Sequence, residues 1–184
     1  MKNFFENYID IAKKEVENCP VDELLEAKKI LDDVKQKNKK LFLFGNGASS
    51  SIASHFSLDF TKQAKLKAVT FSDPPTLTAY ANDFGYAKSY MKYLESHFEK
   101  EDAVIFISCS GNSPNLVNCA EFARDQKLRT ISLTGFNGEN KLAEICNISL
   151  NVNSKSYNLI ESIHTLYLSM LCDSLIGKME YSVS

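Results

Sequence analysis

Five short apolar runs recur along the chain, and each is stopped by a turn of small or polar residues. They occupy residues 41–44, 68–71, 103–107, 130–133 and 148–152, with helical patterns between them. Wholly apolar runs of this length suit strands that are covered on both faces, as in a parallel sheet. A chain that alternates strand and helix is therefore predicted to be an α/β protein, a three-layer αβα sandwich around a five-stranded parallel sheet.

Apolar residues at spacings of three and four predict the helices. They are expected near residues 3–18, 21–37, 49–62, 76–98, 114–126, 139–145 and 157–178. The first two precede every strand, so we expect them to pack outside the sheet or against another subunit. The 184 residues contain no evident linker, which predicts a single domain over 1–184, with N-terminal helices over 1–38 and the αβα core over 39–178.

Composition excludes several classes of protein. Hydrophobic residues make up 44% and charged residues 24%, which excludes a disordered chain, and a net charge of -2 predicts no direct nucleic-acid binding. We find no secretory signal and no apolar run near the roughly 20 residues of a membrane span, so no membrane association is expected. The 5 cysteines include no CxxC pair and indicate free thiols, so the expected location is cytoplasmic.

Polar residues gather where the first and third apolar runs end. Residues 45–51 read Gly-Asn-Gly-Ala-Ser-Ser-Ser, and residues 108–114 read Ser-Cys-Ser-Gly-Asn-Ser-Pro. Ligands of open α/β sheets bind outside the carboxyl ends of the strands. Hydroxyls and free N–H groups at a helix start can hold a phosphate there without arginine, and this chain has only Arg124 and Arg129.

Each loop also has a plainer interpretation. Neither matches the GxGxxG or Walker pattern, and the first could be an ordinary strand-to-helix turn. In the second, Ser113 before Pro114 could simply cap a helix, although a cap would not explain Ser108 and Ser110. Two such loops on one sheet are more specific than either alone.

Together with other stretches, these loops resemble the sugar isomerase (SIS) domains, and among them the phosphoheptose isomerases. The resemblance covers residues 40–176, and its most family-specific piece is the NDFGY segment, 82–86. The matching stretches, in family order, are GNGASS (45–50), HF (55–56), SDPPTLTAYANDFGY (72–86), ISCSGNSPN (107–115), SLTGFNG (132–138) and IESIH (160–164).

The resemblance implies a flavodoxin-like fold, a homotetramer with active sites at subunit interfaces, and a phosphorylated sugar as substrate. The implied reaction converts sedoheptulose 7-phosphate to D-glycero-D-manno-heptose 7-phosphate through an enediol. Such a reaction needs a base, a second acid or base near the carbonyl, and stabilisation of the enediolate. In this family a divalent metal, commonly zinc, can supply that stabilisation.

The resemblance also implies roles for individual residues. Asp59 would be the catalytic base, Glu161 a second catalytic carboxylate, and His55 would join both as metal ligands. His55 and Asp59 are four residues apart and share a helical face, but a packed helical histidine and a solvated carboxylate are the plainer alternatives. The implied substrate contacts are the phosphate-binding serines Ser49, Ser108, Ser110 and Ser113 and the sugar-binding residues Asn46, Asp83 and Cys109, the last where Thr is common.

Several positions depart from the family pattern. Asp59 stands where Glu is usual and Glu161 where Gln is usual, whereas Gln63 replaces an Arg and Ser169 a catalytic His. His164 is the nearest candidate to replace that His. It lies five residues before Ser169, roughly 140° around a helix, and has its own family counterpart, so we expect it not to take over the role.

Two hypotheses follow. The first is an aldose–ketose isomerase of sugar phosphates, favoured by His55, Asp59 and the NDFGY segment. The second is a non-catalytic SIS module that binds a sugar phosphate or a protein partner, like the superfamily member that binds a bacterial replication initiator. Ser169 and Gln63 favour this second hypothesis.

Overall fold

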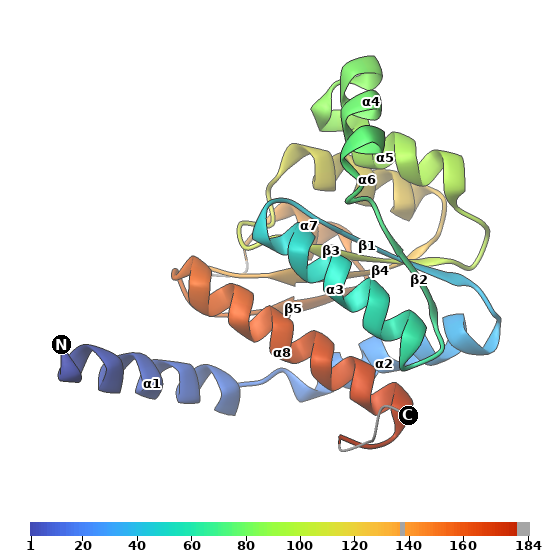
Figure 1. The fold of residues 1–184 in the computed structure, drawn as a ribbon. Helices are drawn as coiled ribbons and strands as arrows, with labels where there is room; N and C mark the ends of the chain where they lie inside the picture. The colour runs from blue at the N-terminus through green and yellow to red at the C-terminus, as the bar shows by residue number, and fades with distance from the viewer. Residues whose placement is uncertain (137–138, 180–184) are drawn as a thin grey trace.

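All five expected strands form, and they pair in parallel as one sheet in the order β2-β1-β3-β4-β5 (Figure 1). The computed structural model describes residues 1–136 and 139–179. The strands are β1 (Lys40–Gly45), β2 (Lys67–Thr70), β3 (Ala103–Ile107), β4 (Arg129–Thr134) and β5 (Ile148–Asn151). The strand order is that of flavodoxin-like doubly wound sheets, so the predicted fold class is confirmed.

Helices cover both faces of the sheet because successive strand side chains point to opposite sides. In β1, Leu41 and Leu43 join one buried cluster, whereas Phe42 and Phe44 join the other. The first cluster includes residues of α2 (Val21–Gln36), α3 (Ala48–Lys62) and α8 (Tyr157–Ile176). The second includes residues of α5 (Tyr86–His97), α6 (Pro114–Asp125) and α7 (Lys141–Ile145).

The two N-terminal helices behave differently from each other. α2 belongs to one outer layer of the sandwich and buries five residues, including Leu31 and Val34, so it is part of the core rather than an addition to it. α1 (Lys2–Glu17) buries no residue and extends away from the sheet (Figure 1). Its Phe4 and Phe5 are 65% and 59% exposed, so α1 presents an apolar surface to its surroundings.

The single helix expected over residues 76–98 is two helices. Gly85 has φ 78°, in the left-handed region that glycine adopts without strain, and its N–H caps α4 (Pro74–Phe84) by donating to Ala81. α5 starts at the next residue, Tyr86. The break projects α4 beyond the sandwich, at the top of Figure 1, and α4 itself buries no residue.

α8 forms over almost all of the range expected for it and is strongly apolar. Its 20 residues meet the length and hydropathy of a membrane span, whereas we expected no such run. Nine of its residues are buried, among them Leu168 and Leu171. Burial against the sheet accounts for this apolar composition, as in a core helix.

A buried histidine joins α8 to the end of β4. The His164 side chain is fully buried, and its Nε2 lies 2.9 Å from the carbonyl oxygen of Thr134. Its Nδ1 has no hydrogen-bond partner among the described residues. Burial lowers the pKa of His164 to about 4, so the imidazole is neutral in the folded protein near neutral pH.

This burial predicts acid sensitivity. An unfolded chain protonates His164 near pH 6.5, whereas the folded chain does so only near pH 4, so the unfolded state binds more protons between these values. The free energy of unfolding should fall by about 2 kcal/mol between pH 7 and pH 5 through this residue. Urea titrations at both pH values check it: the fall should be smaller by that amount in His164→Leu and unchanged in His97→Gln. An equal fall in wild type and His164→Leu would contradict the prediction.

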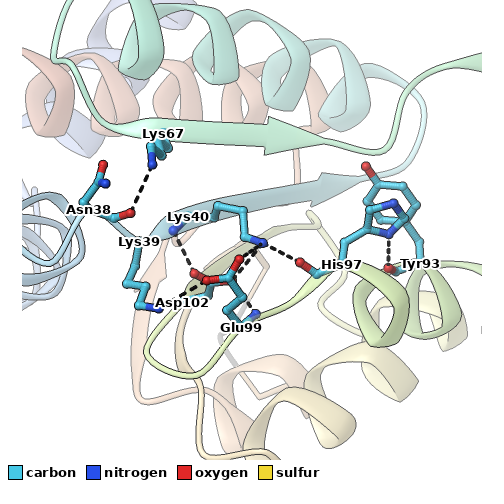
Figure 2. Close-up of polar contacts among 8 residues, drawn as sticks. All are labelled: Asn38, Lys39, Lys40, Lys67, Tyr93, His97, Glu99 and Asp102. Carbon is cyan, nitrogen blue, oxygen red and sulfur yellow. Dashed lines mark hydrogen bonds and ion pairs between the residues drawn. The ribbon is translucent and has the colours of Figure 1, made fainter.

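A buried carboxylate ties the start of β1 to the turn before β3. Asp102 is fully buried and accepts hydrogen bonds from the backbone N–H groups of Lys40, at 2.8 Å, and Glu99, at 2.7 Å. Figure 2 shows the Lys40 side chain extending over the same turn, where its Nζ donates to the carbonyl oxygen of His97 and to Glu99. This contact lies at the amino ends of the strands, away from the serine-rich loops.

Asp102→Ala should lower the free energy of unfolding by about 3 kcal/mol, because the partly buried N–H groups of Lys40 and Glu99 lose their charged acceptor. Glu101→Ala, the matched control, removes only a half-exposed ion pair with Lys37 and should have a much smaller effect. Denaturant unfolding of both variants measures the difference. Equal effects would show that Asp102 is not the tie between β1 and β3.

Candidate functional site

The site lies at the topological switch point of the sheet, where the connections from neighbouring strands lead to opposite sides. β1 leads to β2 on one side, whereas β3 leads to β4 on the other. Gly45 is paired with Ile107 at the ends of the two strands, so the loops that follow start side by side. Such a switch point leaves a crevice at the carboxyl ends of the strands, where this class of sheet binds ligands.

The first loop depends on two glycines. A Cβ on Gly45 would lie 2.6 Å from the backbone of Ser49, so only glycine permits this close approach. Gly47 has φ 56° and precedes α3. The turn places the nearly buried Ser49 in the first turn of α3, where backbone N–H groups have no partner within the helix.

The second loop directs hydroxyl groups toward the first. The Oγ atoms of Ser108 and Ser110 accept from the N–H groups of Gly111 and Asn112, at 3.2 and 3.3 Å, so both hydroxyl protons are left to donate. Ser113 occupies the N-cap position of α6, but its side chain makes no capping hydrogen bond. Capping alone therefore does not explain this serine.

A cavity of about 160 Å³ lies between the two loops and the start of α8. Seven of the predicted site residues line it: Asn46, Ser49, Ser108, Cys109, Ser110, Ser113 and Glu161. Tyr157 and Ile107, which were not predicted, complete the lining. Ligand sites usually exceed 300 Å³, so this cavity suits a phosphate and a few neighbouring atoms rather than a whole sugar phosphate.

Cys109 and Glu161 meet inside the cavity. The Cys109 Sγ lies 4.0 Å from a Glu161 carboxylate oxygen. Burial and the nearby Glu161 charge raise the pKa of Cys109 to about 11. The thiol thus stays protonated near neutral pH, when it can act as a weak donor but not as a thiolate nucleophile.

His55 and Asp59 form a pair outside this cavity. The His55 Nε2 lies 3.3 Å from Asp59 Oδ2, as their spacing predicts, and the His55 side chain is 60% exposed. Gln63 Nε2 donates to the other oxygen of Asp59 at 3.0 Å. At about 1.5 Å per residue, Asp59 lies about 15 Å along α3 from Ser49.

These positions test the predicted zinc site within one chain. Among residues 1–136 and 139–179, no three His, Cys, Asp or Glu side chains are grouped so that they could hold a metal ion. Glu161 lines the serine-rich cavity, whereas His55 and Asp59 pair separately. One chain therefore provides a two-donor pair and does not by itself fit the tetrahedral zinc site.

Three other residues singled out from the sequence do not line the cavity. Asp83 is exposed near the end of α4, where its Oδ1 accepts from Asn82. The Ser169 hydroxyl donates to the carbonyl oxygen of Thr165, one turn earlier in α8, at 3.0 Å. His164 lies on α8, with its side chain buried against the end of β4. Asn137 and Gly138, in the matching stretch 132–138, lie outside the described residues.

Sequence reasoning missed two residues that bond to Asn46. Helical spacing indicated packing for the tyrosines between residues 80 and 93, and Tyr90 does pack in the core. Tyr86 is instead exposed, and its hydroxyl donates to Asn46 Oδ1 at 2.7 Å. Asn115, buried in the first turn of α6, exchanges two hydrogen bonds with the Asn46 amide. The signal was their place in the NDFGY and ISCSGNSPN segments.

A second polar cavity, of about 450 Å³, lies at the amino ends of β3 and β4, opposite the serine-rich loops. Lys37, Lys100, Lys127 and Arg129 contribute to its lining, together with the acidic residues Glu101 and Asp102. Two of the cations are already paired, Lys37 with Glu101 and Asp33 and Arg129 with Asp33. This cavity is thus larger but already largely charge-balanced.

Comparisons with known proteins agree with this architecture. The SIS domain family model matches residues 3–135. The chain is 34% identical over 188 residues to the phosphoheptose isomerase of Aliarcobacter butzleri (strain RM4018), covering 98% of this chain and 97% of that protein. It is 36% identical over 152 residues to that of Helicobacter pylori (strain P12), covering 79% of each.

A solved structure agrees as well. The phosphoheptose isomerase from Francisella tularensis superposes with a TM-score of 0.87 at 30% identity, over 96% of both chains. The agreement extends over the whole sandwich, including the helices that frame the two serine-rich loops. By sequence and by fold, this chain belongs to the phosphoheptose isomerase family of SIS-domain proteins.

Proposed function

We propose that this protein is a sugar-phosphate aldose–ketose isomerase that converts sedoheptulose 7-phosphate to D-glycero-D-manno-heptose 7-phosphate. The observation that carries the proposal is the cavity at the β1–β3 switch point, where both serine-rich loops meet Glu161. Family membership supplies the reaction class, and the cavity supplies groups that suit its substrate.

The serines form the phosphate end of the proposed site. Ser49, Ser110 and Ser113 line the cavity at the starts of α3 and α6, whose free N–H groups and helix dipoles favour an anion. Ser108 directly follows β3, and its hydroxyl, which accepts from the Gly111 N–H, keeps its proton to donate to the phosphate. Hydroxyls and helix ends thus replace the arginine clamp that this chain lacks.

The reacting carbons lie beyond this end. Sedoheptulose 7-phosphate carries its phosphate on C7 and reacts at C1 and C2, at the far end of its chain. Groups that move the proton must therefore lie outside the phosphate cradle, as His55 and Asp59 do on α3. In the proposed mechanism Asp59 takes the proton from C1 while the C2 carbonyl oxygen gains a proton, which gives the enediol. Asp59 then returns its proton to C2 as the C1 hydroxyl loses its proton, which completes the aldose.

Glu161 and Cys109 would act between these ends. We assign Glu161 to the sugar oxygens, where its carboxylate accepts hydrogen bonds or exchanges a proton with the carbonyl oxygen. The protonated Cys109 thiol orients Glu161 from 4.0 Å and contacts the sugar in place of the usual threonine hydroxyl. Asp83, on the projecting α4, would close over the sugar from the other side.

The proposed assembly is a cytoplasmic homotetramer with active sites at subunit interfaces. The small cavity leaves most of a heptose phosphate uncovered, so a second chain would supply further walls. The exposed apolar side chains of α1, including Phe4, Phe5 and Ile9, suit a contact with another copy. All five cysteines are free thiols, which is consistent with a reducing compartment.

Zinc binding stays a prediction of the family resemblance. His55 and Asp59 would provide two ligands, and the remaining donors would come from another subunit or from Glu161 after rearrangement. Metal analysis of protein purified without chelators checks the prediction, and metal bound in wild type but lost in His55→Ala would support it.

One observation favours the alternative, a non-catalytic module that binds a sugar phosphate or a protein partner. Ser169 stands where the family has a catalytic histidine, and its hydroxyl is engaged with its own helix. A serine cannot exchange protons near neutral pH, so one acid–base group of the family is absent at that position. The phosphate cradle would serve such a module equally well.

The cradle predicts graded effects at Ser110. Ser110→Ala removes one hydroxyl donor and should raise the KM for sedoheptulose 7-phosphate by about tenfold, the value of one hydrogen bond to a charged group. Ser110→Asp adds a negative charge at the same place and should raise it by more than about 100-fold. Steady-state kinetics and the Ki of inorganic phosphate measure both. Similar small effects of the two substitutions would contradict phosphate binding at this loop.

A coupled assay with sedoheptulose 7-phosphate, with and without added zinc, tests the activity itself. Wild type should turn over, and Asp59→Asn should lose at least about 100-fold in kcat, the usual contribution of a general base. Asp59→Glu restores the carboxylate that the family normally has and should retain activity.

Wild-type turnover no greater than that of Asp59→Asn, under both conditions, would overturn the isomerase proposal. Binding of the sugar phosphate without turnover, measured by calorimetry, would then support the non-catalytic module. The Asp59→Glu variant separates loss of the carboxylate from a general disturbance of α3.

A further inference from the structure

The Asn46 side chain, in the loop after β1, is held by one residue from α5 and one from α6. Its Oδ1 accepts from the Tyr86 hydroxyl at 2.7 Å and from Asn115 Nδ2 at 2.9 Å. Its Nδ2 donates to Asn115 Oδ1 at 3.0 Å. α5 and α6 thereby connect directly to the loop after β1.

These contacts account for most of the hydrogen-bonding capacity of the Asn46 amide. A carboxamide oxygen has two lone pairs, and both are occupied here by Tyr86 and Asn115. The amide nitrogen has two hydrogens, and one is directed to Asn115. Within the described part of the chain, the second N–H has no partner, and Asn46 lines the serine-rich cavity.

Tyr86 donates to the Asn46 amide in the orientation that the structure has. The reciprocal pair of Asn46 and Asn115 would be equally satisfied if both amides were turned over. If the amide were rotated by half a turn, both N–H groups of Asn46 would donate to Tyr86 and Asn115, and only an oxygen lone pair would be left for a ligand. The observed orientation instead gives the Tyr86 hydroxyl proton an acceptor in the chain, whereas the other would direct it to solvent.

We propose that Tyr86 and Asn115 are positioning residues that hold Asn46 as a pure N–H donor, which recognises an oxygen acceptor of the sugar next to the phosphate. The inference rests on the proposed function and deepens it, because it specifies what Asn46 can accept as a ligand. Asn46 rejects a group that can only donate, and Tyr86 and Asn115 act through it without touching the substrate.

The break at Gly85 makes Tyr86 available for this role. Tyr86 is the first residue of α5, directly after the left-handed Gly85. The α5 helix is held on α6 by a hydrogen bond from Asn118 Nδ2 to the Ala87 carbonyl oxygen at 2.8 Å. The tyrosine is thus anchored at its base while the residue is 51% exposed, so its hydroxyl can be removed with little effect on the core.

The first experiment compares Tyr86→Phe with Tyr93→Phe. Tyr93 lies on the same helix but stacks on Phe71 and is the matched control. Tyr86→Phe should raise the KM for sedoheptulose 7-phosphate about fivefold, the value of one neutral hydrogen bond, with kcat within about twofold. The Ki of inorganic phosphate should change by less than about twofold. An unchanged KM, or an equal rise in the phosphate Ki, would overturn the proposal.

A double-mutant cycle tests whether Tyr86 acts through Asn46. In an Asn46→Ala background, Tyr86→Phe should cause no further rise in KM, because the group that it positions is gone. A full additional fivefold rise would show that Tyr86 acts independently and would overturn the positioning role. Asn115→Leu, which keeps the buried volume, should behave in the same way as Tyr86→Phe.

A readout that needs no turnover separates this inference from the proposed function. The side-chain N–H resonances of Asn46, identified by their loss in Asn46→Asp, should shift in Tyr86→Phe and stay in place in Tyr93→Phe. If wild type lacks turnover, the proposed function fails while this spectrum still tests the positioning. Resonances that are unmoved in Tyr86→Phe would overturn it.

Discussion

The parallel pairing of β1 with β3 is the constraint on which the rest of the site depends. It places Gly45 beside Ile107, so two loops far apart in sequence begin side by side. Chain connections leave this pair in opposite directions, to β2 and to β4, which is the arrangement that leaves a crevice at the carboxyl ends of the strands. Shifting this register by one residue would turn the β1 side chains to the wrong faces and separate the serine loops.

The helices of the site extend this geometry toward the reacting end of the substrate. α3 and α8 pack against each other, with Ser49 and Glu161 at the loop end and the His55–Asp59 pair further along α3. In the proposed mechanism, phosphate binding falls to the loop end and proton transfer to the His55–Asp59 pair on α3. Among the departures from the family pattern, Asp59, Gln63 and Ser169 lie outside the serine-rich cavity, whereas Cys109 and Glu161 line it beside the retained serines.

Much of the fold was predictable because it rests on local patterns. Wholly apolar runs such as 103–107 are typical of strands covered on both faces. The grouping of the serines followed from their place at the ends of such strands. The break at Gly85 was missed because helical periodicity continues across it. Tyr86 and Asn115 were missed because their role depends on long-range contacts with Asn46, which no spacing rule reveals.

The central claim is that the substrate phosphate binds in the cradle between the β1 and β3 loops. A crystal structure of the protein with sedoheptulose 7-phosphate tests it most directly. We expect the phosphate oxygens to lie within hydrogen-bonding distance of Ser49, Ser110 and Ser113, with the sugar extending toward Glu161. A phosphate bound instead in the larger cavity beside Lys127 and Arg129, at the amino ends of β3 and β4, would contradict it.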